Sequence, residues 1–150
     1  MNDQSQRDQV AELLRAAGAT KLPGYLGFEL VSLGEGSASM RCEITEHHGA
    51  PNGYLHAGAV IALADTAAGY GCIGNLPEGG TGFTTIELKA NFLGTSLEGA
   101  MLATAKMLHG GRTTQVWDVT VTMEGSEKVL ALFRCTQLVL HQPGKEIKAP

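Results

Sequence analysis

The sequence predicts an α+β domain in which a curved antiparallel sheet of six strands wraps around one long central helix. The stretch 54–70 is apolar almost all the way round, which predicts a helix that is enclosed on every side and continues to about residue 74. Two runs with a strand-like period precede this helix and four follow it, with turn residues between them. A sheet of these strands covers such a helix by curling around it.

The remaining elements follow from local patterns. Ser5 and Asp8 resemble a capping box, and apolar residues at helical spacing then run to Gly18, which is placed to stop a short surface helix. A linker broken at Pro23 and Gly24 completes the N-terminal segment, residues 1–24. We expect a polar loop over residues 46–55 and a frayed tail over residues 142–150. The predicted strands cover residues 27–33, 37–45, 82–93, 99–108, 113–123 and 128–140.

Alternation also predicts which side of a strand is buried. In the second predicted strand the inward residues are Ala38, Met40, Cys42 and Ile44. In the fifth they are Trp117, Val119, Val121 and Met123.

Chain length and composition favour one domain spanning residues 1–150, and they exclude several classes of partner. A net charge of −4 without a basic block argues against nucleic acid and anionic membranes as partners. The first twelve residues carry four charges where a signal peptide needs an apolar run, so we expect a cytoplasmic protein. The central helix is short for a membrane span and contains Asp65, which favours a soluble protein.

The cysteines and histidines do not predict a disulfide framework or a metal site. The three cysteines are far apart and lack CxxC spacing, so we expect reduced thiols, with a nucleophilic cysteine as a lesser alternative. His47 and His48, taken with Cys42 and His56, match no metal-site spacing, so we expect a solvated loop and no metal.

Two features of the central helix point to chemistry. Asp65 is a lone carboxylate in apolar surroundings, which is costly unless the carboxylate has a role. The helix start offers unpaired backbone N–H groups, and Ala57 and Gly58 are small enough to let a ligand carbonyl approach these donors. His56 and Asn52, just before the helix, can hold a carbonyl, a water or the loop itself.

Asp65 and Ala57 cannot act together within one chain. Eight residues separate them, which is about 12 Å along a helix that rises ~1.5 Å per residue. Either the two are unrelated, or Asp65 comes from a second subunit. A two-fold dimer would create two equivalent composite sites, and we favour that interpretation.

The sequence resembles the hotdog-fold acyl-CoA thioesterases, in particular the branch related to the phenylacetate-degradation thioesterase. The resemblance covers about residues 25–140 and is carried by 52–58 (NGYLHAG), by Asp65-Thr66 and by 84–92 (TTIELKANF). It implies a hotdog fold, hydrolysis of an acyl-CoA thioester without metal or other cofactor, and a homodimer that often pairs into a homotetramer. Coenzyme A is then part of the substrate.

The resemblance also implies residue roles. Asp65 would be the nucleophile or general base, and the Ala57 N–H would polarise the thioester carbonyl. His56 would orient the loop, Asn52 would position the attacking water or the thioester, and Thr85 would assist the carboxylate. The family's His-Gly-Gly is His56-Ala57-Gly58 here, so the methyl group of Ala57 narrows the approach of the carbonyl.

Other interpretations remain for most of these residues. Asp65 can be a structural carboxylate, His56 a helix cap, Asn52 a turn residue and Thr85 an ordinary strand residue. Lys89 and Arg112 can meet the phosphates of coenzyme A or be simple exposed cations. Two alternative functions also remain: a hotdog hydratase or dehydratase, and a non-catalytic acyl-CoA-binding module.

Overall fold

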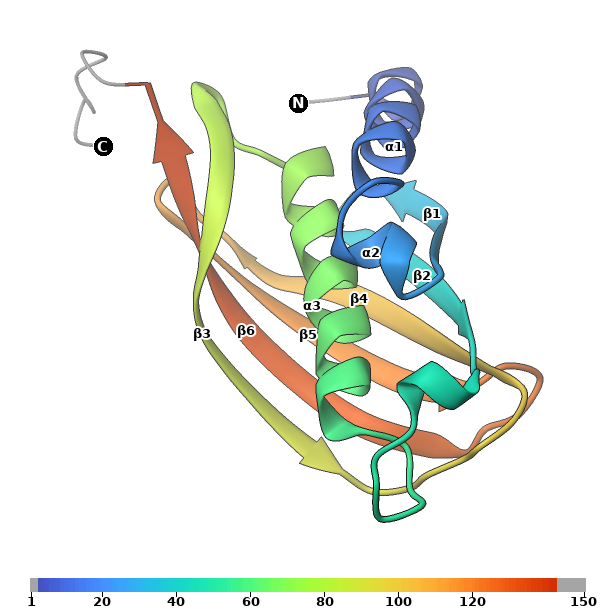
Figure 1. Cartoon of the computed structure of the whole chain (residues 1–150). Helices are drawn as coiled ribbons and strands as arrows, with labels where there is room; N and C mark the ends of the chain where they lie inside the picture. The colour runs from blue at the N-terminus through green and yellow to red at the C-terminus, as the bar shows by residue number, and fades with distance from the viewer. Residues whose placement is uncertain (1–2, 143–150) are drawn as a thin grey trace.

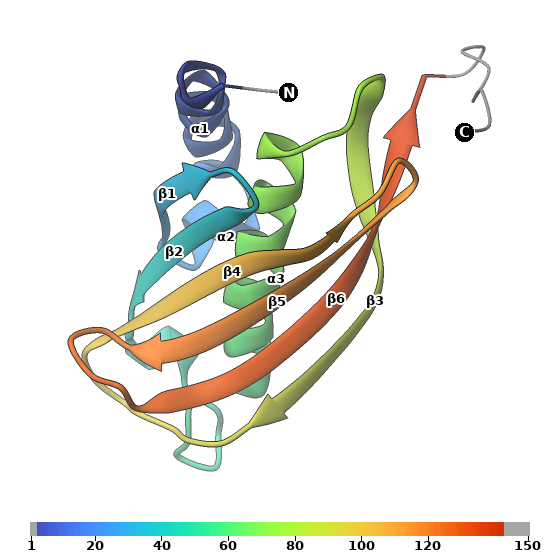
Figure 2. The same cartoon turned by 180° about the vertical axis from the view of Figure 1, so that it is seen from behind.

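The computed structural model describes residues 3–142 and confirms the predicted architecture. Six antiparallel strands form one sheet in the order β1-β2-β4-β5-β6-β3. Figure 1 shows this sheet curving around α3, which lies across the concave face, with α1 and α2 beside β1. Figure 2 shows the convex face, which no described helix covers. The elements are α1 (Gln4–Gly18), α2 (Leu22–Tyr25), β1 (Phe28–Gly34), β2 (Ser37–Glu43), η1 (Glu46–His48), α3 (Ala57–Gly74), β3 (Gly80–Phe92), β4 (Ala100–Gly110), β5 (Thr114–Met123) and β6 (Val129–His141).

The inward faces predicted from alternation are confirmed. Ala38, Met40 and Cys42 of β2 are buried, and Ile44 just beyond the strand is buried with them. Trp117, Val119 and Val121 of β5 are buried too, and Met123 is partly buried against the same core. These side chains and the buried face of α3 form the hydrophobic core of the domain.

Glycines let α3 lie close to the sheet. A Cβ atom at Gly71 would come within 2.6 Å of the indole ring of Trp117, and one at Gly69 within 2.6 Å of the ring of Phe83. Because contacts that short do not occur between real atoms, the helix could not sit this deep with larger residues.

Hydrogen bonds fix the C-terminal end of α3. The Asn75 side chain donates to the carbonyls of Gly34 (3.0 Å) and Gly71 (2.9 Å), and accepts from the N–H of Gly36 (2.9 Å). The buried Gln115 donates to the Asn75 carbonyl at 2.8 Å. The helix is therefore held in register with the turn between β1 and β2.

Helix α1 covers the β1 edge of the sheet. Gln4 donates to the Leu33 carbonyl at 2.9 Å, and the guanidinium of Arg15 donates to the Leu30 carbonyl at 3.0 and 3.3 Å. Side chains thus satisfy backbone carbonyls that an open edge would leave to another strand. The predicted cap was wrong by two residues: Asp3, not Ser5, caps the helix by accepting from the N–H of Gln6.

Three expectations need correction. Helix α3 is not enclosed on every side, because Ile61, Ala62, Asp65 and Thr66 form a half-exposed stripe. The linker before β1 contains the short helix α2, which Pro23 starts rather than prevents, since proline suits the first turn of a helix. The loop 46–55 contains the 3-10 turn η1.

Two further expectations concern the C-terminal tail and a membrane span. Of the predicted tail, residues 142–150, residues 143–150 lie outside the described residues. Within residues 3–142, α3 is the one helix with the length and mean hydropathy (1.3) of a membrane span, and it is the core helix of this domain.

Candidate active site

Asp65 and Thr85 meet between α3 and the edge strand β3. The hydroxyl of Thr85 donates to Asp65 Oδ1 at 3.0 Å, and the carboxylate is half-buried. Burial raises the pKa of Asp65 above its usual value, and the Thr85 hydrogen bond opposes part of that shift. No described lysine, arginine or histidine forms an ion pair with it. A carboxylate without a counter-charge in this setting is suited to accept a proton or attack an electrophile.

A β-bulge at Ile86 adjoins this pair. Thr85 is opposite Gln137 of β6, yet Glu87 is opposite Thr136, so Ile86 is the extra residue. The bulge changes which residues face inward, from Phe83 and Thr85 before it to Leu88, Ala90 and Phe92 after it.

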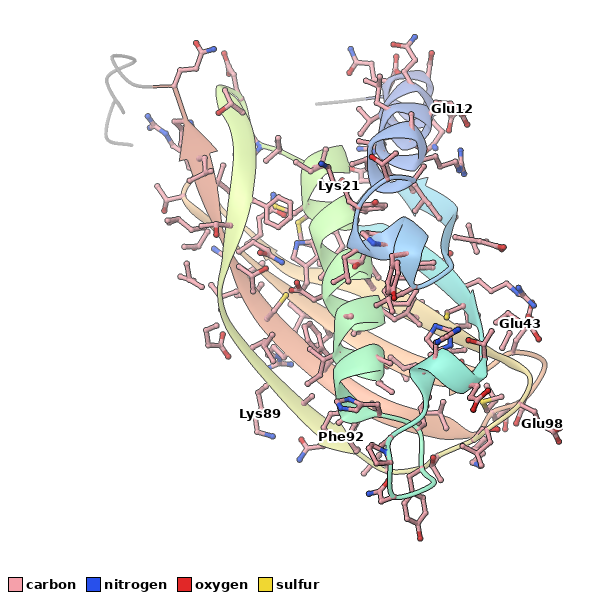
Figure 3. The ribbon with its side chains drawn as sticks, viewed as in Figure 1. Glu12, Lys21, Glu43, Lys89, Phe92 and Glu98 are labelled. Carbon is pink, nitrogen blue, oxygen red and sulfur yellow. The ribbon has the colours of Figure 1, made fainter. Side chains whose placement is uncertain are left out.

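The inward-facing side of β3 beyond the bulge is not covered. Leu88 and Phe92 are 40% and 46% exposed although they face the concave side. Figure 3 places Phe92 at the end of β3 beside the start of α3. An open apolar strip therefore leads from Asp65 toward the helix start, within the described part of the chain.

His56 caps α3 and determines which backbone donor remains free. Its Nδ1 accepts from the Gly58 N–H at 2.8 Å, so a neutral His56 carries its proton on Nε2. A Cβ at Gly58 would come within 2.9 Å of that nitrogen, so glycine at this position makes room for the capping ring. The N–H of Ala59 already donates to the His56 carbonyl at 3.0 Å.

The expectation of an unpaired N–H at Gly58 is therefore wrong, because that group donates to His56. The N–H of Ala57 is the free donor of this helix start. It has no hydrogen-bond partner among residues 3–142. Ala57 is exposed, so a ligand carbonyl can reach it. The donor lies at the positive end of the α3 dipole, which favours a developing negative charge.

The loop before α3 is braced by a buried histidine. His48 Nδ1 accepts from the Thr45 N–H at 2.9 Å, which leaves Nε2 to donate to the Leu26 carbonyl at 2.7 Å. The His48 carbonyl in turn accepts from the His56 N–H at 2.9 Å. The expected solvated loop is therefore wrong for His48, which is 3% exposed, although His47 is exposed.

Asn52 occupies the tip of the same loop. Its Oδ1 accepts from the Tyr54 N–H at 3.2 Å, and Gly53 adopts a positive φ of 86°. This is the geometry of an Asx turn, so the side-chain oxygen supports the loop. The structure does not bring Asn52 into contact with Asp65 of the same chain.

The two predicted coenzyme A contacts lie apart from Asp65. Lys89 points away from α3 (Figure 3), and it donates to Asn91 Oδ1 at 2.6 Å. Arg112 lies in the turn between β4 and β5, where its carbonyl is 2.9 Å from His141 Nε2. The structure therefore groups neither cation with Asp65 and Thr85.

Gln137 is a site residue that the sequence reasoning missed. Its Oε1 is 2.8 Å from Thr85 Oγ1, its Nε2 donates to Cys135 Sγ at 3.3 Å, and its side chain is fully buried. The available signal was a glutamine on the inward side of a strand whose other inward residues are apolar. These are Ala131, Phe133, Cys135 and Val139.

The three cysteines are free thiols and are buried. Burial raises the pKa of Cys42 to about 11 and the pKa values of Cys72 and Cys135 to about 12. Such thiols stay protonated and are poor nucleophiles. Among residues 3–142, no group of three or more His, Cys, Asp or Glu side chains is placed to hold a metal ion.

Comparison with known proteins adds independent evidence. A family model described as "Thioesterase superfamily" matches residues 52–130, a range that includes the helix start, Asp65 and Thr85. The 1,4-dihydroxy-2-naphthoyl-CoA hydrolase of Listeria monocytogenes is 39% identical over 111 residues, which cover 74% of this chain and 89% of that protein. The acyl-coenzyme A thioesterase PaaI of Escherichia coli is 32% identical over 110 residues, or 73% of this chain and 75% of that protein.

Solved structures agree in fold. The Escherichia coli PaaI protein aligns with a TM-score of 0.77 and 26% identity, over 88% of this chain and 94% of that one. A mutant of the thioesterase PA1618 from Pseudomonas aeruginosa aligns with a TM-score of 0.81 and 26% identity over the same shares.

Proposed function

This chain belongs to the thioesterase superfamily, and from that premise we propose that it hydrolyses acyl-CoA thioesters to a free acid and coenzyme A. Two relatives whose names specify a coenzyme A thioester as substrate support this choice. The observation that carries the proposal is the half-buried Asp65 carboxylate, held by Thr85 on the side of α3 that faces the edge strand β3.

We propose that each site combines two protomers. Helix α3 is continuous from Ala57 to Gly74, so Asp65 lies about 12 Å along the axis from Ala57 at ~1.5 Å per residue. One acyl carbon cannot contact both groups of the same chain. A two-fold dimer that brings the Ala57 N–H of one protomer to Asp65 of its partner removes this obstacle, and it creates two equal sites.

The open edge of the sheet supports β3 as the dimer contact. Side chains of α1 satisfy carbonyls of the β1 edge, whereas no described element covers the β3 edge. The partly exposed Leu88 and Phe92 lie on that strand, and contact with a second copy would bury them. To match Asp65 with the partner's Ala57, the two-fold axis must cross α3 midway between these residues, about 6 Å from Asp65 along the helix axis. On β3 this distance is about two residues beyond Thr85 at ~3.3 Å per residue. The extra residue of the bulge moves the point one residue further, to Leu88.

In the proposed reaction, the thioester carbonyl accepts a hydrogen bond from the Ala57 N–H of one protomer. Asp65 of the other protomer then either attacks the acyl carbon or removes a proton from an attacking water. Coenzyme A leaves as the thiolate. In the first route the resulting mixed anhydride is hydrolysed by water; in the second the acid forms directly. Negative charge on the carbonyl oxygen is stabilised at the positive end of α3 in both routes.

The other predicted residues have supporting roles in this proposal. His56 caps the helix that carries the Ala57 donor, and its Nε2–H remains available to the thioester. Asn52 shapes the loop, and its amide nitrogen, which has no hydrogen-bond partner among residues 3–142, would hold a water. Lys89 and Arg112 remain proposals for contacts with the phosphates of coenzyme A, at exposed positions away from the carboxylate.

A panel of acyl-CoAs tests the function through the release of free thiol. We expect hydrolysis of at least one saturated or aromatic acyl-CoA and almost none after Asp65→Asn. An enoyl-CoA whose ultraviolet absorbance changes without thiol release would instead indicate a hydratase. Binding of acyl-CoA without turnover, unaffected by Asp65→Asn, would indicate a binding module.

A further inference from the structure

A chain of hydrogen bonds leads from Asp65 into the sheet. Thr85 Oγ1 is 3.0 Å from Asp65 Oδ1 and 2.8 Å from Gln137 Oε1. Gln137 Nε2 continues the chain to Cys135 Sγ at 3.3 Å. Gln137 and Cys135 are both fully buried, so neither can touch a substrate. Gln137 has no part in the reaction proposed above.

The hydroxyl of Thr85 has one hydrogen for two acceptors. If Asp65 is ionised, Asp65 Oδ1 and Gln137 Oε1 both need that hydrogen and only one can have it. If Asp65 is protonated, its O–H donates to Thr85 Oγ1 and the Thr85 O–H donates to Gln137 Oε1, so every group is satisfied. The observed orientation of the Gln137 amide therefore suits a protonated Asp65.

Rotation of the amide by a half turn suits the ionised carboxylate. Gln137 Nε2 then donates to Thr85 Oγ1, and the Thr85 O–H donates to Asp65. Gln137 Oε1 now faces Cys135, whose thiol is protonated because burial raises its pKa to about 12, and the S–H can donate to it. Cys135 can accept from the amide in one orientation and donate to it in the other.

We propose that Gln137 is a positioning residue whose amide rotates with the charge of Asp65 and directs the Thr85 hydrogen to the carboxylate when Asp65 is ionised. This inference rests on the proposed function, in which the ionised Asp65 is the reactive form. The Cys135 thiol of β6 interacts electrostatically with Asp65, with Glu87 of β3 and with Cys72 of α3. Glu87 accepts a hydrogen bond from Thr136 at 2.8 Å, whereas the hydrogen bond to Asp65 comes from Thr85.

Kinetics of substitutions along the chain test the proposal. Gln137→Met keeps the size of the side chain and removes both hydrogen-bonding groups. We expect kcat to fall about three- to tenfold, the worth of one hydrogen bond, with KM nearly unchanged because Gln137 is buried. Thr85→Val removes the hydroxyl through which Gln137 acts. In a Thr85→Val background, Gln137→Met should therefore lower kcat no further.

Several results would overturn the proposal. The first is a folded Gln137→Met protein with unchanged kcat. The second is a fall in kcat that accompanies a fall in melting temperature while the pH profile of kcat stays unchanged. The third is additive effects of the two substitutions on kcat in the double variant. A wild-type protein that hydrolyses no thioester would refute the proposed function instead.

A second measurement uses the wild-type protein, with Asp65→Asn as its control. In the wild-type protein, NMR contacts of the Gln137 side-chain NH2 should move from Cys135 at low pH to Thr85 at higher pH. The change should follow the titration of Asp65 and be absent in Asp65→Asn. An amide that keeps the same contacts throughout the titration would contradict the inference.

Discussion

Replacing Ala57 by proline removes a single hydrogen-bond donor from the helix start with little change to the fold. Proline fits the first position of a helix, and residue 57 is that position in α3. Proline also requires an extended conformation of the residue before it, and His56 has φ −68° and ψ 127°. The N–H that is lost has no partner among residues 3–142, so no internal hydrogen bond is broken.

These facts separate the effect on catalysis from the effect on stability. Loss of one oxyanion donor typically lowers kcat by about 10²–10³, or ~2.7–4 kcal/mol. A proline at a compatible position changes stability by about 1 kcal/mol or less, often in the favourable direction. We therefore expect Ala57→Pro to be folded and nearly inactive.

The assay combines thiol release with thermal unfolding. Ala57→Gly is the matched control, because it changes the same side chain but keeps the N–H. It should retain activity or increase it, since the methyl group beside the carbonyl is removed. Activity of Ala57→Pro within a few-fold of the wild type, at an unchanged melting temperature, would refute the role of this donor.

Three further predictions follow from the site and the core. Asp65→Asn should lower kcat at least about 100-fold. It should also raise the free energy of unfolding at neutral pH. Because burial raises the pKa of Asp65 in the folded state, the stability contributed by this carboxyl is fully present below its unfolded pKa and is lost as pH rises through the folded pKa. The stability gain of Asp65→Asn should therefore shrink in acid, and a gain independent of pH would contradict this account. Gly71→Ala should destabilise the protein by about 1–3 kcal/mol, since its Cβ would lie 2.6 Å from the Trp117 ring, and that cost exceeds the gain in helix propensity. Gly82→Ala is the control, because a Cβ at Gly82 would have no neighbouring atom within 4 Å. Equal melting temperatures of the Gly71→Ala and Gly82→Ala variants would be inconsistent with the packing of α3 on Trp117. The three buried thiols should react with Ellman's reagent only after unfolding, because burial raises their pKa values to about 11–12. Rapid modification of the native protein would show that the thiols are accessible.

Patterns local to the sequence predicted much of the fold. The period of two in β2 and β5 identified their buried sides, and the apolar run with a lone Asp65 located the central helix. Features that depend on pairing between strands distant in the sequence could not be predicted from local patterns. The bulge at Ile86 exists only relative to β6, and without it the inward residues of β3 could not be assigned.

The candidate site also contains features that the sequence predicted and features that only the fold reveals. The pairing of Asp65 with Thr85 was implied by the family resemblance, whereas Gln137 required the register between β3 and β6. His48 was missed because its partners, Thr45 and the Leu26 carbonyl, meet only in the folded chain. Composition did not reveal the half-exposed stripe on α3, because two of its four members, Ile61 and Ala62, are as apolar as their buried neighbours. In the sequence only Asp65 and Thr66 mark it.

The most direct test of a site shared between protomers is recovery of activity in mixed dimers. Ala57→Pro and Asp65→Asn homodimers should each be nearly inactive. In a mixed dimer, the Ala57 of the Asp65→Asn chain meets the Asp65 of the Ala57→Pro chain, so one of the two sites is intact. After dissociation and random reassociation half of the dimers are mixed, and activity should return to about a quarter of the wild-type value. Activity that stays at the level of the separate variants, although mass spectrometry detects the mixed dimer, would contradict the shared site.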